Sequence, residues 1–333
     1  MYSFSAKAEL SSPAAAQKYY DGLYRTGRYM DEWNADKKAR VRRILANLRR
    51  AMSATGVAVD FGCGTGEFTP VLAGALPGWT VVGAELSDVA VTAARGRFPN
   101  LLFGTVSEIL SSGRKFDLIF THHVLEHVAD LESTWREMAG LLKPTGFMVH
   151  ILPCGNAGSF EHAIALARPD GVQRGAGNRF FFEDPSHLRR LTTDDLVQLA
   201  AATGLRLEFE AYANQYYGAI RWITEDPRNA LRLTNTKGIR DKAQTRRLTR
   251  LRLGLFSVSA ARFAASGLEV ICSLRFGNRL NLAKAAVATL LGPLLPLCCL
   301  VDSRVRARAE AEWKQRAGDR AGSEMYLAFG PAQ

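Results

Sequence analysis

The stretch VAVDFGCGTGEF, residues 57–68, decides the fold class. An apolar run ends in Asp60, and three glycines follow at alternate positions, Gly62, Gly64 and Gly66. A buried strand that runs through a glycine-rich turn into a helix is a ligand-binding arrangement of parallel α/β sheets, because free backbone N–H groups at the helix start face the ligand. The stretch therefore predicts a binding site at the carboxyl end of a central strand.

Short apolar segments alternate with helical segments along the rest of the chain. Further strands are expected at 80–86, 101–106, 115–122, 146–153, 205–212 and 323–329. Helices are expected at 67–76, 88–96 and 192–203, with another helical stretch between the fourth and fifth strands that ends at Leu142. This alternation predicts an α/β fold whose parallel sheet is covered by helices on both faces.

The composition suits a globular protein with one large domain and an insertion, or with two domains. The chain has 333 residues, of which 47% are hydrophobic. Its five cysteines lack metal-ligand spacing, and Cys298 and Cys299 are adjacent, so no disulfide framework is expected. The N-terminal stretch has no apolar core behind a basic end, which predicts no secretory signal. A cytoplasmic location is therefore expected, with peripheral membrane contact as its alternative form.

The positive charge is concentrated in the last third of the chain. The net charge is +11, and residues 216–333 carry 20 basic and 9 acidic side chains. Residues 228–252 are strongly basic, whereas 285–301 carry no charge and are interrupted by Gly292 and two prolines. Such a segment is too short and too broken to span a bilayer. A buried helix is the favoured interpretation, and a shallow membrane contact within 228–301 is the alternative.

The acids around the glycine turn indicate which ligand it holds. A dinucleotide would place its pyrophosphate on the turn, where Asp60 and Glu67 would repel it. The spacing is also G-x-G-x-G, without the third glycine of the dinucleotide motif. Glu85 ends the second strand, where a carboxylate commonly accepts the ribose hydroxyls. The pattern favours a nucleoside with a cationic tail, which describes S-adenosylmethionine (SAM).

These motifs resemble those of the class I SAM-dependent methyltransferases of bacteria, in particular the branch that acts on saccharides and small molecules. The resemblance covers roughly 55–212 and the last strand, and rests on VDFGCGTGEF, VVGAELS and the segment from FDLIFTHHVLEHV to GFMVHILP. It implies a Rossmann-like, doubly wound sheet of seven strands with a helical insertion between strands six and seven. The implied parts are a helical arm over the cofactor (1–55), the SAM-binding core (56–213), a basic helical lid (214–322) and the final strand (323–333).

The resemblance also implies the cofactor contacts. Asp60 and the three glycines would hold the methionine portion, Glu85 the ribose and Leu86 one adenine face. Many members have an acid that bonds the adenine amine, and this chain has Thr105 there, so its hydroxyl or the Val106 N–H would serve instead. The full implied set is Asp60, Gly62, Cys63, Gly64, Gly66, Glu85, Leu86, Thr105, Val106 and Thr121.

Methyl transfer often requires a base that removes the acceptor's proton, and histidine suits that role near neutral pH. His122 and His123 end the fourth strand, at the ligand-binding edge of such a sheet. The best candidate is His187, because DPSHLRRLT resembles a segment whose histidine faces the substrate region. Its alternative role is to cap the helix at 192–203. His150, inside a strand, is expected to be structural.

Three further residues are candidates for binding the acceptor: Asn156, Glu161 and Tyr24. Tyr24 belongs to an aromatic N-terminal segment, which also contains Tyr19, Tyr20, Tyr29 and Trp33. Relatives fold such an arm over the cofactor, and the alternative is an amphipathic helix packed on the domain.

His123, Glu126 and His127 have the i, i+3, i+4 spacing of one helix face. Some relatives bind a divalent metal with a comparable Glu/His set. The favoured interpretation is a helix start whose His127 packs or bonds locally, so no metal is expected.

Three functions stay open from the sequence. The first is methylation of a small molecule, whether a saccharide, a lipid-linked intermediate or a natural product. The second is RNA methylation through the basic C-terminal region, but no RNA-binding module or N-P-P-Y motif is present, so nucleic acid is not the expected partner. The third is a membrane-associated protein that binds SAM without catalysis. The acceptor atom and the oligomeric state are not defined by the sequence.

Overall fold

The computed structural model describes residues 12–27, 29, 35–277 and 279–332. Trp33 of the expected aromatic arm lies outside the described residues. The chain divides into two compact units. The first comprises Met1–Pro153, Asp184–Glu210 and Met325–Gln333, and the second comprises Cys154–Glu183 and Ala211–Glu324.

The main sheet of the described residues has seven strands in the order β3-β2-β1-β4-β5-β9-β8. Their bounds are β1 Val57–Phe61, β2 Thr80–Glu85, β3 Leu102–Thr105, β4 Phe116–His122, β5 Leu142–Pro153, β8 Leu205–Ala213 and β9 Glu324–Pro331. Strands β1 to β5 pair in parallel. The strand order reverses between β1 and β4, which is the point where such sheets bind ligands. The Rossmann-like, doubly wound fold predicted from the sequence is therefore confirmed.

Backbone hydrogen bonds fix the direction of the last two strands. The Ala332 N–H donates to the Gly204 carbonyl at 2.9 Å, and the Ser323 N–H donates to the Ala213 carbonyl at 3.0 Å. The end of β9 thus lies beside the start of β8, so the two strands are antiparallel. The Cys154 N–H, just after β5, donates to the Ser323 carbonyl at 2.9 Å. The segment between β8 and β9 therefore leaves and re-enters the sheet at the carboxyl edge of the parallel strands.

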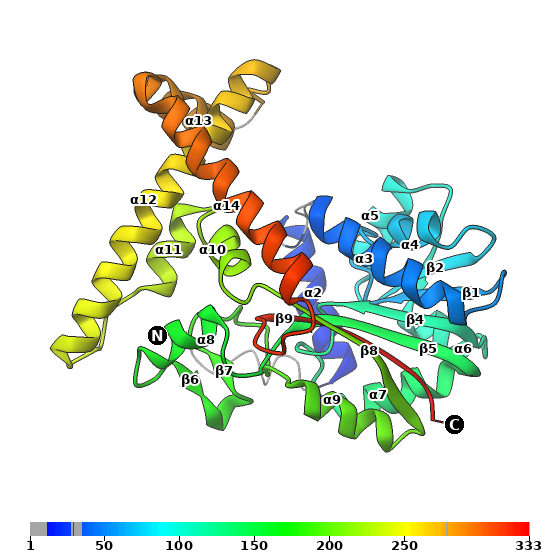
Figure 1. The fold of residues 1–333 in the computed structure, drawn as a ribbon. Coiled ribbons are helices and arrows are strands. Elements are labelled where there is room, and N and C mark those ends of the chain that lie inside the picture. The colour runs from blue at the N-terminus through cyan, green and yellow to red at the C-terminus, as the bar shows by residue number, and fades with distance from the viewer. Residues whose placement is uncertain (1–11, 28, 30–34, 278, 333) are drawn as a thin grey trace. The chain divides into compact units, whose positions relative to one another are not determined.

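Helices cover both faces of the sheet (Figure 1). One face carries α3 (Ala35–Leu48), α4 (Thr69–Ala75) and α5 (Asp88–Arg97), and the other carries α7 (Leu131–Leu141) and α9 (Thr193–Ala201). The first unit also contains α2 (Pro13–Arg25), η1 (Arg49–Ala51) and α6 (Val106–Ser111). Fully buried side chains between these layers form the core, among them Leu45, Leu72, Phe116, Leu118, Ile119, Phe120, Trp135 and Phe329.

Two local expectations were wrong in this region. The residues after β4 were expected to be helical, but Leu125–His127 form a turn, and α7 begins only at Leu131. Asp130 caps that helix by accepting the Ser133 N–H at 2.9 Å. Strand β5 starts at Leu142 rather than at residue 146, because Leu142 pairs with Phe116 across an irregularity in the β4–β5 register. Tertiary pairing here overrides the local helix signal.

The second unit is mainly helical. Its elements are α8 Phe160–Leu166, β6 Val172–Gln173, η2 Arg174–Ala176, β7 Arg179–Phe180, α10 Tyr217–Ile223, α11 Pro227–Leu233, α12 Lys242–Ser273, α13 Arg279–Leu290, η3 Gly292–Leu294 and α14 Leu295–Arg316. Residues 154–183 were assigned to the SAM-binding core from the sequence, but they group with the insertion. The reason is a shared apolar cluster in which Ile164 and Phe180 pack with Ile223 and Leu233.

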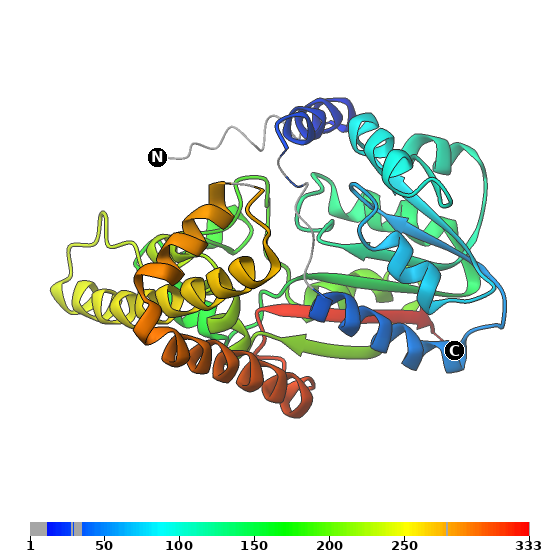
Figure 2. The same cartoon turned by 90° about the horizontal axis from the view of Figure 1, so that it is seen from above.

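The long helices of the second unit pack closely. Helix α12 contacts both α13 and α14 (Figure 2). A Cβ on Gly267 of α12 would lie 2.0 Å from the Lys284 carbonyl oxygen, so glycine permits this helix crossing. The apolar segment 285–301 was expected to form one buried helix, and this expectation was wrong. Its glycine and prolines divide it among α13, η3 and α14, and several of its leucines are exposed.

Candidate active site

The glycine turn follows β1 and takes a conformation that favours glycine. Gly62, Gly64 and Gly66 have φ values of +76°, +55° and +83°. A Cβ on Gly62 would lie 2.4 Å from a methyl carbon of Val124, so the turn also approaches the segment after β4 closely. The Gly62 N–H donates to the Ala84 carbonyl at 2.7 Å, which fixes the turn against the end of β2.

Glu85 ends β2 beside this turn. Its carboxylate accepts the N–H groups of Gly64 at 2.8 Å, Leu86 at 2.8 Å and Ser87 at 3.1 Å. Burial raises the pKa of Glu85, although these three hydrogen bonds act in the opposite direction. A buried carboxylate held by backbone donors at a strand end is well placed to accept hydroxyl groups of a nucleoside.

Asp60 lies at the end of β1 with its side chain buried. Its carboxylate accepts a hydrogen bond from the Thr69 hydroxyl at 2.7 Å. Burial raises the pKa of Asp60 to about 7, against the lowering effect of that hydrogen bond and with a further rise from the nearby charge of Glu85. A cationic ligand near Asp60 would favour its ionised form.

Glu67 was expected to contribute negative charge toward the ligand, and the structure does not support this expectation. Its buried carboxylate forms ion pairs with Lys38, at 2.6 Å, and with Arg97. These two cations neutralise Glu67, so it is not directed at a ligand. The argument for a cationic ligand therefore depends on Asp60 and Glu85.

Helix α2 docks beside the turn through Asp21. The Asp21 carboxylate accepts the Ser87 hydroxyl at the start of α5, and Gln17 donates to Asp88 at 3.0 Å. The Tyr24 hydroxyl lies 3.0 Å from the position of a Cβ on Gly64. Burial, followed by the charge of Glu85, raises the pKa of Tyr24 well above its usual value. Tyr24 was expected to contact the acceptor, but the structure places it against the cofactor turn.

A histidine–carboxylate cluster lies just beyond the carboxyl end of β4. His123 has a left-handed backbone, with φ of +56°, and its Nδ1 lies 3.0 Å from Oε1 of the buried Glu126. Burial opposes ionisation of Glu126, but the His123 hydrogen bond and the nearby His127 and His187 together lower its pKa to about 2. Glu126 is therefore a carboxylate at neutral pH.

His127 and His187 complete the cluster. Their rings meet edge to face at 4.6 Å, and Nδ1 of His127 lies 3.3 Å from the Ser186 carbonyl oxygen. Burial and the neighbouring His187 lower the pKa of His127 to about 4, so its ring is neutral at pH 7. When Nδ1 donates to Ser186, Nε2 is an acceptor that faces Glu126 Oε1 at 4.0 Å.

Backbone contacts bring the distant segment 184–190 to this turn. The Leu188 N–H donates to the Glu126 carbonyl at 2.8 Å. The Arg189 guanidinium donates to the carbonyls of Val128 and Ala129, the latter at 2.9 Å. This pairing explains why His187, some 60 residues after His127 in the chain, reaches the same cluster.

The cluster also offers donors for a metal. The ligand atoms of Glu126, His127 and His187 all lie within 4.8 Å of one another. Imidazole and carboxylate donors of this kind suit a divalent transition metal. The sequence pattern placed His123 in the set, on a helix face. The structure instead assembles the set across a turn, with His187 in place of His123. The expectation that no metal is used stays a prediction.

The remaining candidates at the end of β4 face other partners. His122 is buried and stacks on Phe68, with ring centroids 4.1 Å apart. The Thr121 hydroxyl lies 2.8 Å from Nδ1 of His150, inside the sheet. Successive side chains of a strand alternate between its faces, so Thr121 cannot face the same side as His122. The Thr121 side chain thus has a partner inside the sheet, and its contact with the cofactor stays a prediction. His150 is structural as expected, and burial lowers its pKa to about 3.

The other expected cofactor residues have structural partners. Thr105 caps α6 and forms a reciprocal capping box with Glu108, and Val106 is the first residue of that helix. The Cys63 side chain packs in an apolar cluster with Val91 and Phe103. Helix α6 was not predicted, although the T-x-x-E pattern at residues 105–108 is a capping-box signal for a helix that begins at this point.

The acceptor candidates Asn156 and Glu161 both belong to the second unit. The Asn156 side-chain amide donates to the Arg320 carbonyl at 3.1 Å. The buried Glu161 carboxylate accepts the Trp222 Nε1–H at 2.7 Å and the Ser323 hydroxyl. These bonds give both residues a role in holding the second unit together.

Two tyrosines of the arm were not assigned a role from the sequence. The Tyr29 hydroxyl donates to Asp184 at 3.0 Å and lies 2.8 Å from the Ser186 hydroxyl. Burial, the neighbouring tyrosines and then the charges of Glu85 and Glu126 raise the pKa of Tyr20. Tyr20 is thus within electrostatic reach of both the cofactor carboxylate and the histidine cluster. The tyrosine spacing alone could not show this.

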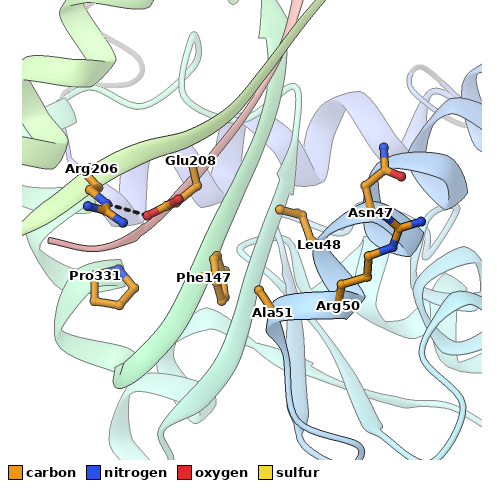
Figure 3. A pocket seen from close by; sticks show the side chains of 8 residues that line it. All are labelled: Asn47, Leu48, Arg50, Ala51, Phe147, Arg206, Glu208 and Pro331. Carbon is orange, nitrogen blue, oxygen red and sulfur yellow. Dashed lines mark hydrogen bonds and ion pairs between the residues drawn. The ribbon is translucent and has the colours of Figure 1, made fainter. Parts of the chain in front are cut away.

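A separate pocket of about 440 Å³ lies at the other end of the sheet (Figure 3). It is lined by Asn47, Leu48, Arg50, Ala51, Phe147, Arg206, Glu208 and Pro331. Arg206 is near the start of β8 and Pro331 ends β9, so this is the amino edge of the parallel strands. An ion pair of 2.6 Å between Arg206 and Glu208 crosses its wall. Open α/β sheets bind ligands at the carboxyl edge, so this pocket is not the candidate site.

The fold and the glycine turn are those of the class of α/β proteins that bind nucleotides or nucleosides, and comparison with known proteins specifies the family. The chain belongs to the family described as "Methyltransferase domain", whose model matches residues 30–209. With the doubly wound sheet described above, this match places the chain in the family of class I SAM-dependent methyltransferases, whose cofactor is SAM.

The curated relatives include two kinds of enzyme. A trans-aconitate 2-methyltransferase of Methylobacterium radiotolerans is 31% identical over 106 residues, which is 32% of this chain and 41% of the relative. A ubiquinone biosynthesis O-methyltransferase of Bradyrhizobium diazoefficiens is 27% identical over 177 residues, which is 51% of this chain and 69% of the relative. The match spans less than two thirds of the length of the first relatives.

Among solved structures, the [4+2]-cyclase SpnF superposes with a TM-score of 0.50 and 14% identity, and the match covers 96% of each chain. At that identity the likeness supports the fold alone.

Proposed function

We propose that this protein transfers the methyl group of SAM to a hydroxyl oxygen of a small-molecule acceptor. The observation that carries the proposal is the pairing of His123 with Glu126 in the unit that holds the glycine turn and Glu85. A Cβ on Gly62 would lie 2.4 Å from a methyl carbon of Val124, the residue after His123, so the glycine turn and the pair belong to one neighbourhood. A cofactor cradle beside an oriented histidine suits the methylation of an acceptor that must lose a proton.

The reaction is an in-line displacement at the sulfonium of SAM. The acceptor oxygen forms a bond to the methyl carbon, the carbon–sulfur bond breaks, and S-adenosylhomocysteine leaves. A hydroxyl acceptor loses its proton in this step, and a positioned imidazole accelerates that transfer by roughly 10²–10⁴. The Glu126 carboxylate, 3.0 Å from Nδ1 of His123, favours the neutral tautomer with the proton on Nδ1, and in that tautomer Nε2 is the basic nitrogen.

His187 is the second candidate for the base. It was favoured from the sequence, and in the structure it is half-buried against His127. His122 is less suited to proton transfer, because its ring is buried and stacked on Phe68. We assign the base role to His123 or His187, and their separate replacement distinguishes the two.

The names of the relatives support an oxygen acceptor of small size. One kind acts on trans-aconitate and the other is an O-methyltransferase of ubiquinone biosynthesis. We further propose that residues 214–322 form a lid that selects the acceptor, since that segment begins and ends at the carboxyl edge of the sheet. A cytoplasmic location fits this proposal.

The acceptor class is tested by incubating the protein with methyl-labelled SAM and an extract of the source cells. The products are then separated into small-molecule, lipid, RNA and protein fractions. We expect the label in the small-molecule or lipid fraction, and none above background with the Glu85→Ala variant. Label in RNA would contradict the proposal and would favour the basic C-terminal region as an RNA-binding surface.

A further inference from the structure

The second unit exposes a concentration of large apolar side chains in one short segment. We call residues 274–300 the elbow. Eight large hydrophobic side chains among its described residues are exposed: Leu274, Phe276, Leu280, Leu282, Leu290, Leu294, Leu297 and Leu300. The exposed fraction reaches 77% for Leu274 and 82% for Leu290. Single exposed leucines are ordinary, but so many large exposed apolar side chains within one short segment indicate an interaction surface.

The charge around the elbow has one sign. No Asp or Glu occurs between Glu269 and Asp302. Three basic residues, Arg275, Arg279 and Lys284, fall within this interval. The elbow therefore presents apolar side chains flanked only by cations. That combination matches the boundary between anionic lipid headgroups and acyl chains.

The geometry of the elbow excludes a simple membrane span. Helix α13 has 12 residues, a length of about 18 Å at 1.5 Å per residue, whereas a hydrocarbon core is roughly 30 Å thick. The chain then bends by 83° between α13 and the following helix. Pro293 and Pro296 lie at the bend. The two helices on either side of the bend are therefore suited to lie along the surface of a bilayer rather than to cross the bilayer.

Within the described residues, α12 is the helix whose length and composition would allow it to cross a membrane. In the most apolar 18-residue stretch of α12, 39% of the residues are buried, so most of that stretch is accessible. However, the apolar half of α12 also carries two charged residues, Arg262 and Glu269. Arg262 is buried and bonds Asp302 of α14 at 2.8 Å. This pair would have to enter the hydrocarbon if α12 were a span, at considerable cost.

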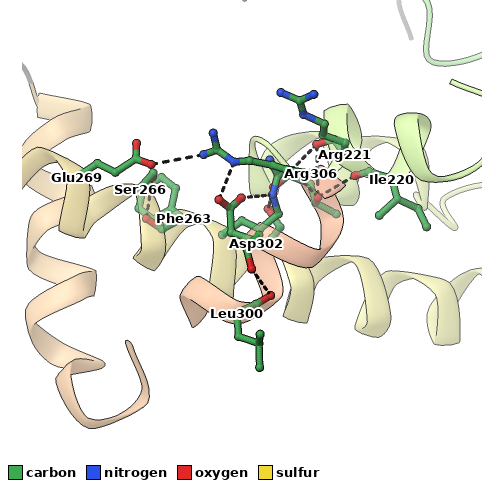
Figure 4. A network of polar contacts seen from close by, with 12 residues as sticks. Ile220, Arg221, Phe263, Ser266, Glu269, Leu300, Asp302 and Arg306 are labelled. Atoms are coloured by element: carbon green, nitrogen blue, oxygen red, sulfur yellow. Dashed lines mark hydrogen bonds and ion pairs between the residues drawn. The ribbon is translucent and has the colours of Figure 1, made fainter. Parts of the chain in front are cut away.

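These charges instead form the base of the elbow (Figure 4). Arg306 bonds the same Asp302 carboxylate at 2.7 Å and lies 3.6 Å from Glu269. Arg262 also donates to the Thr224 hydroxyl at 2.8 Å and to the Arg221 carbonyl, which ties the network to α10. The network joins three helices, and its Asp302 comes directly after the end of the uncharged segment 285–301.

The inner face of the elbow is already packed. Ala264 and Ala265 of α12 form an apolar cluster with Cys298 of α14, against which Val287 and Leu291 pack. The exposed leucines therefore belong to helices that already have a packed core of their own. A framework of this kind can present apolar side chains without unfolding.

We propose that the elbow binds the surface of an anionic lipid bilayer, with its outer leucines at the headgroup boundary and Arg275, Arg279 and Lys284 at the phosphates. A second copy of the chain would cover the leucines, but it would not account for three cations without a neighbouring acid. The proposal does not depend on the identity of the methyl acceptor.

The test is co-sedimentation of the full chain with vesicles of phosphatidylcholine alone or with 30 mol% phosphatidylglycerol, at several salt concentrations. We expect binding to the anionic vesicles that weakens as salt rises. The double variant Leu290→Glu/Leu294→Glu should lower the partition coefficient at least tenfold. Arg275→Glu/Arg279→Glu should lower it by a similar factor on anionic vesicles and remove the salt dependence.

The matched control is Leu166→Glu, which adds a charge at an exposed leucine of α8, outside the elbow. It should bind vesicles as the unchanged protein does. SAM binding by every variant verifies that each one folds. Absence of vesicle binding by the unchanged protein, or equal binding by the Leu290→Glu/Leu294→Glu variant, would overturn the proposal. So would a stable dimer that the same double variant dissociates.

Discussion

Nδ1 of His123 lies 3.0 Å from Oε1 of Glu126, and this contact is made across a turn rather than along a helix. The left-handed backbone of His123 directs its ring back toward the carboxylate. Burial of Glu126 keeps its carboxylate away from water, and the ionised carboxylate favours the His123 tautomer with its proton on Nδ1. The pair therefore has the form of an oriented proton acceptor.

If this pair acts in proton transfer, Glu126→Gln should lower turnover while leaving SAM affinity unchanged. The amide keeps the size of the side chain but no longer fixes the His123 tautomer, and a loss of roughly 10²–10⁴ is expected from a misdirected base. His123→Ala should show a similar loss. Single-turnover kinetics with saturating SAM provide the measurement, and calorimetry provides the control for cofactor binding.

His187→Ala separates the two base candidates. If His123 is the base, the His187 variant should retain turnover within about tenfold, and its main effect should be on the KM of the acceptor. A loss as large as that of His123→Ala, with SAM affinity unchanged, would give the base role to His187 instead.

Chelation tests the metal alternative. We expect activity to survive exhaustive treatment with EDTA, because Glu126 Oε1 already lies 3.0 Å from Nδ1 of His123, and Nδ1 of His127 lies 3.3 Å from the Ser186 carbonyl oxygen. Loss of activity that a divalent cation restores would show that Glu126, His127 and His187 hold a metal, and His127→Ala should then abolish the restoration.

SAM affinity should depend on pH through Asp60. Burial raises the pKa of this carboxyl to about 7, and the ammonium and sulfonium of SAM favour its ionised form. Binding should therefore weaken as pH falls below 7, by up to about tenfold per pH unit. Titration calorimetry between pH 5.5 and 8 measures the effect. Asp60→Asn should bind more weakly at pH 8, with little remaining pH dependence.

His150 should make the fold sensitive to acid. Burial lowers its pKa from 6.5 to about 3, so the folded state keeps this ring neutral while the unfolded chain binds a proton below pH 6.5. Its contribution to stability is therefore present above pH 6.5 and is lost progressively as pH falls toward 3, by about 1.4 kcal/mol per pH unit. Urea unfolding of His150→Gln at pH 7, 6 and 5 should show a shallower decline than the unchanged protein. Equal slopes would show that His150 does not titrate in this way.

The sequence predicted the positions of the strands along the chain and the glycine turn because their signals are local. The apolar runs, the positive-φ glycines and the acid at the end of β2 each depend on a few adjacent residues. The expectation for Glu67 was wrong because the residues next to it in the sequence do not show that Lys38 and Arg97, on two other helices, form ion pairs with it. Its charge is neutralised by tertiary contacts that no pattern at 57–68 contains.

The histidine cluster was predictable in part. His123, Glu126 and His127 were recognised as a group, but from a helical spacing that the structure replaces with a turn. His187 joins them only because the Leu188 N–H and the Arg189 guanidinium bond the backbone of that turn. Strand alternation could have shown that the side chains of Thr121 and His122 face opposite sides of the sheet. Segment 154–183 packs with the insertion through contacts at long sequence separation, which a chain-order argument cannot anticipate.

The central claim is that SAM binds at the glycine turn with its ribose on Glu85, and calorimetry of SAM with Glu85→Ala tests it most directly. Glu67→Gln is the matched control, because Glu67 is equally buried on the same turn but faces Lys38 and Arg97. We predict that Glu85→Ala weakens SAM binding by roughly 10- to 150-fold, the loss of a charge-assisted hydrogen bond, while Glu67→Gln binds as before. Unchanged SAM affinity in Glu85→Ala, or tighter binding of NAD than of SAM by the unchanged protein, would contradict the account.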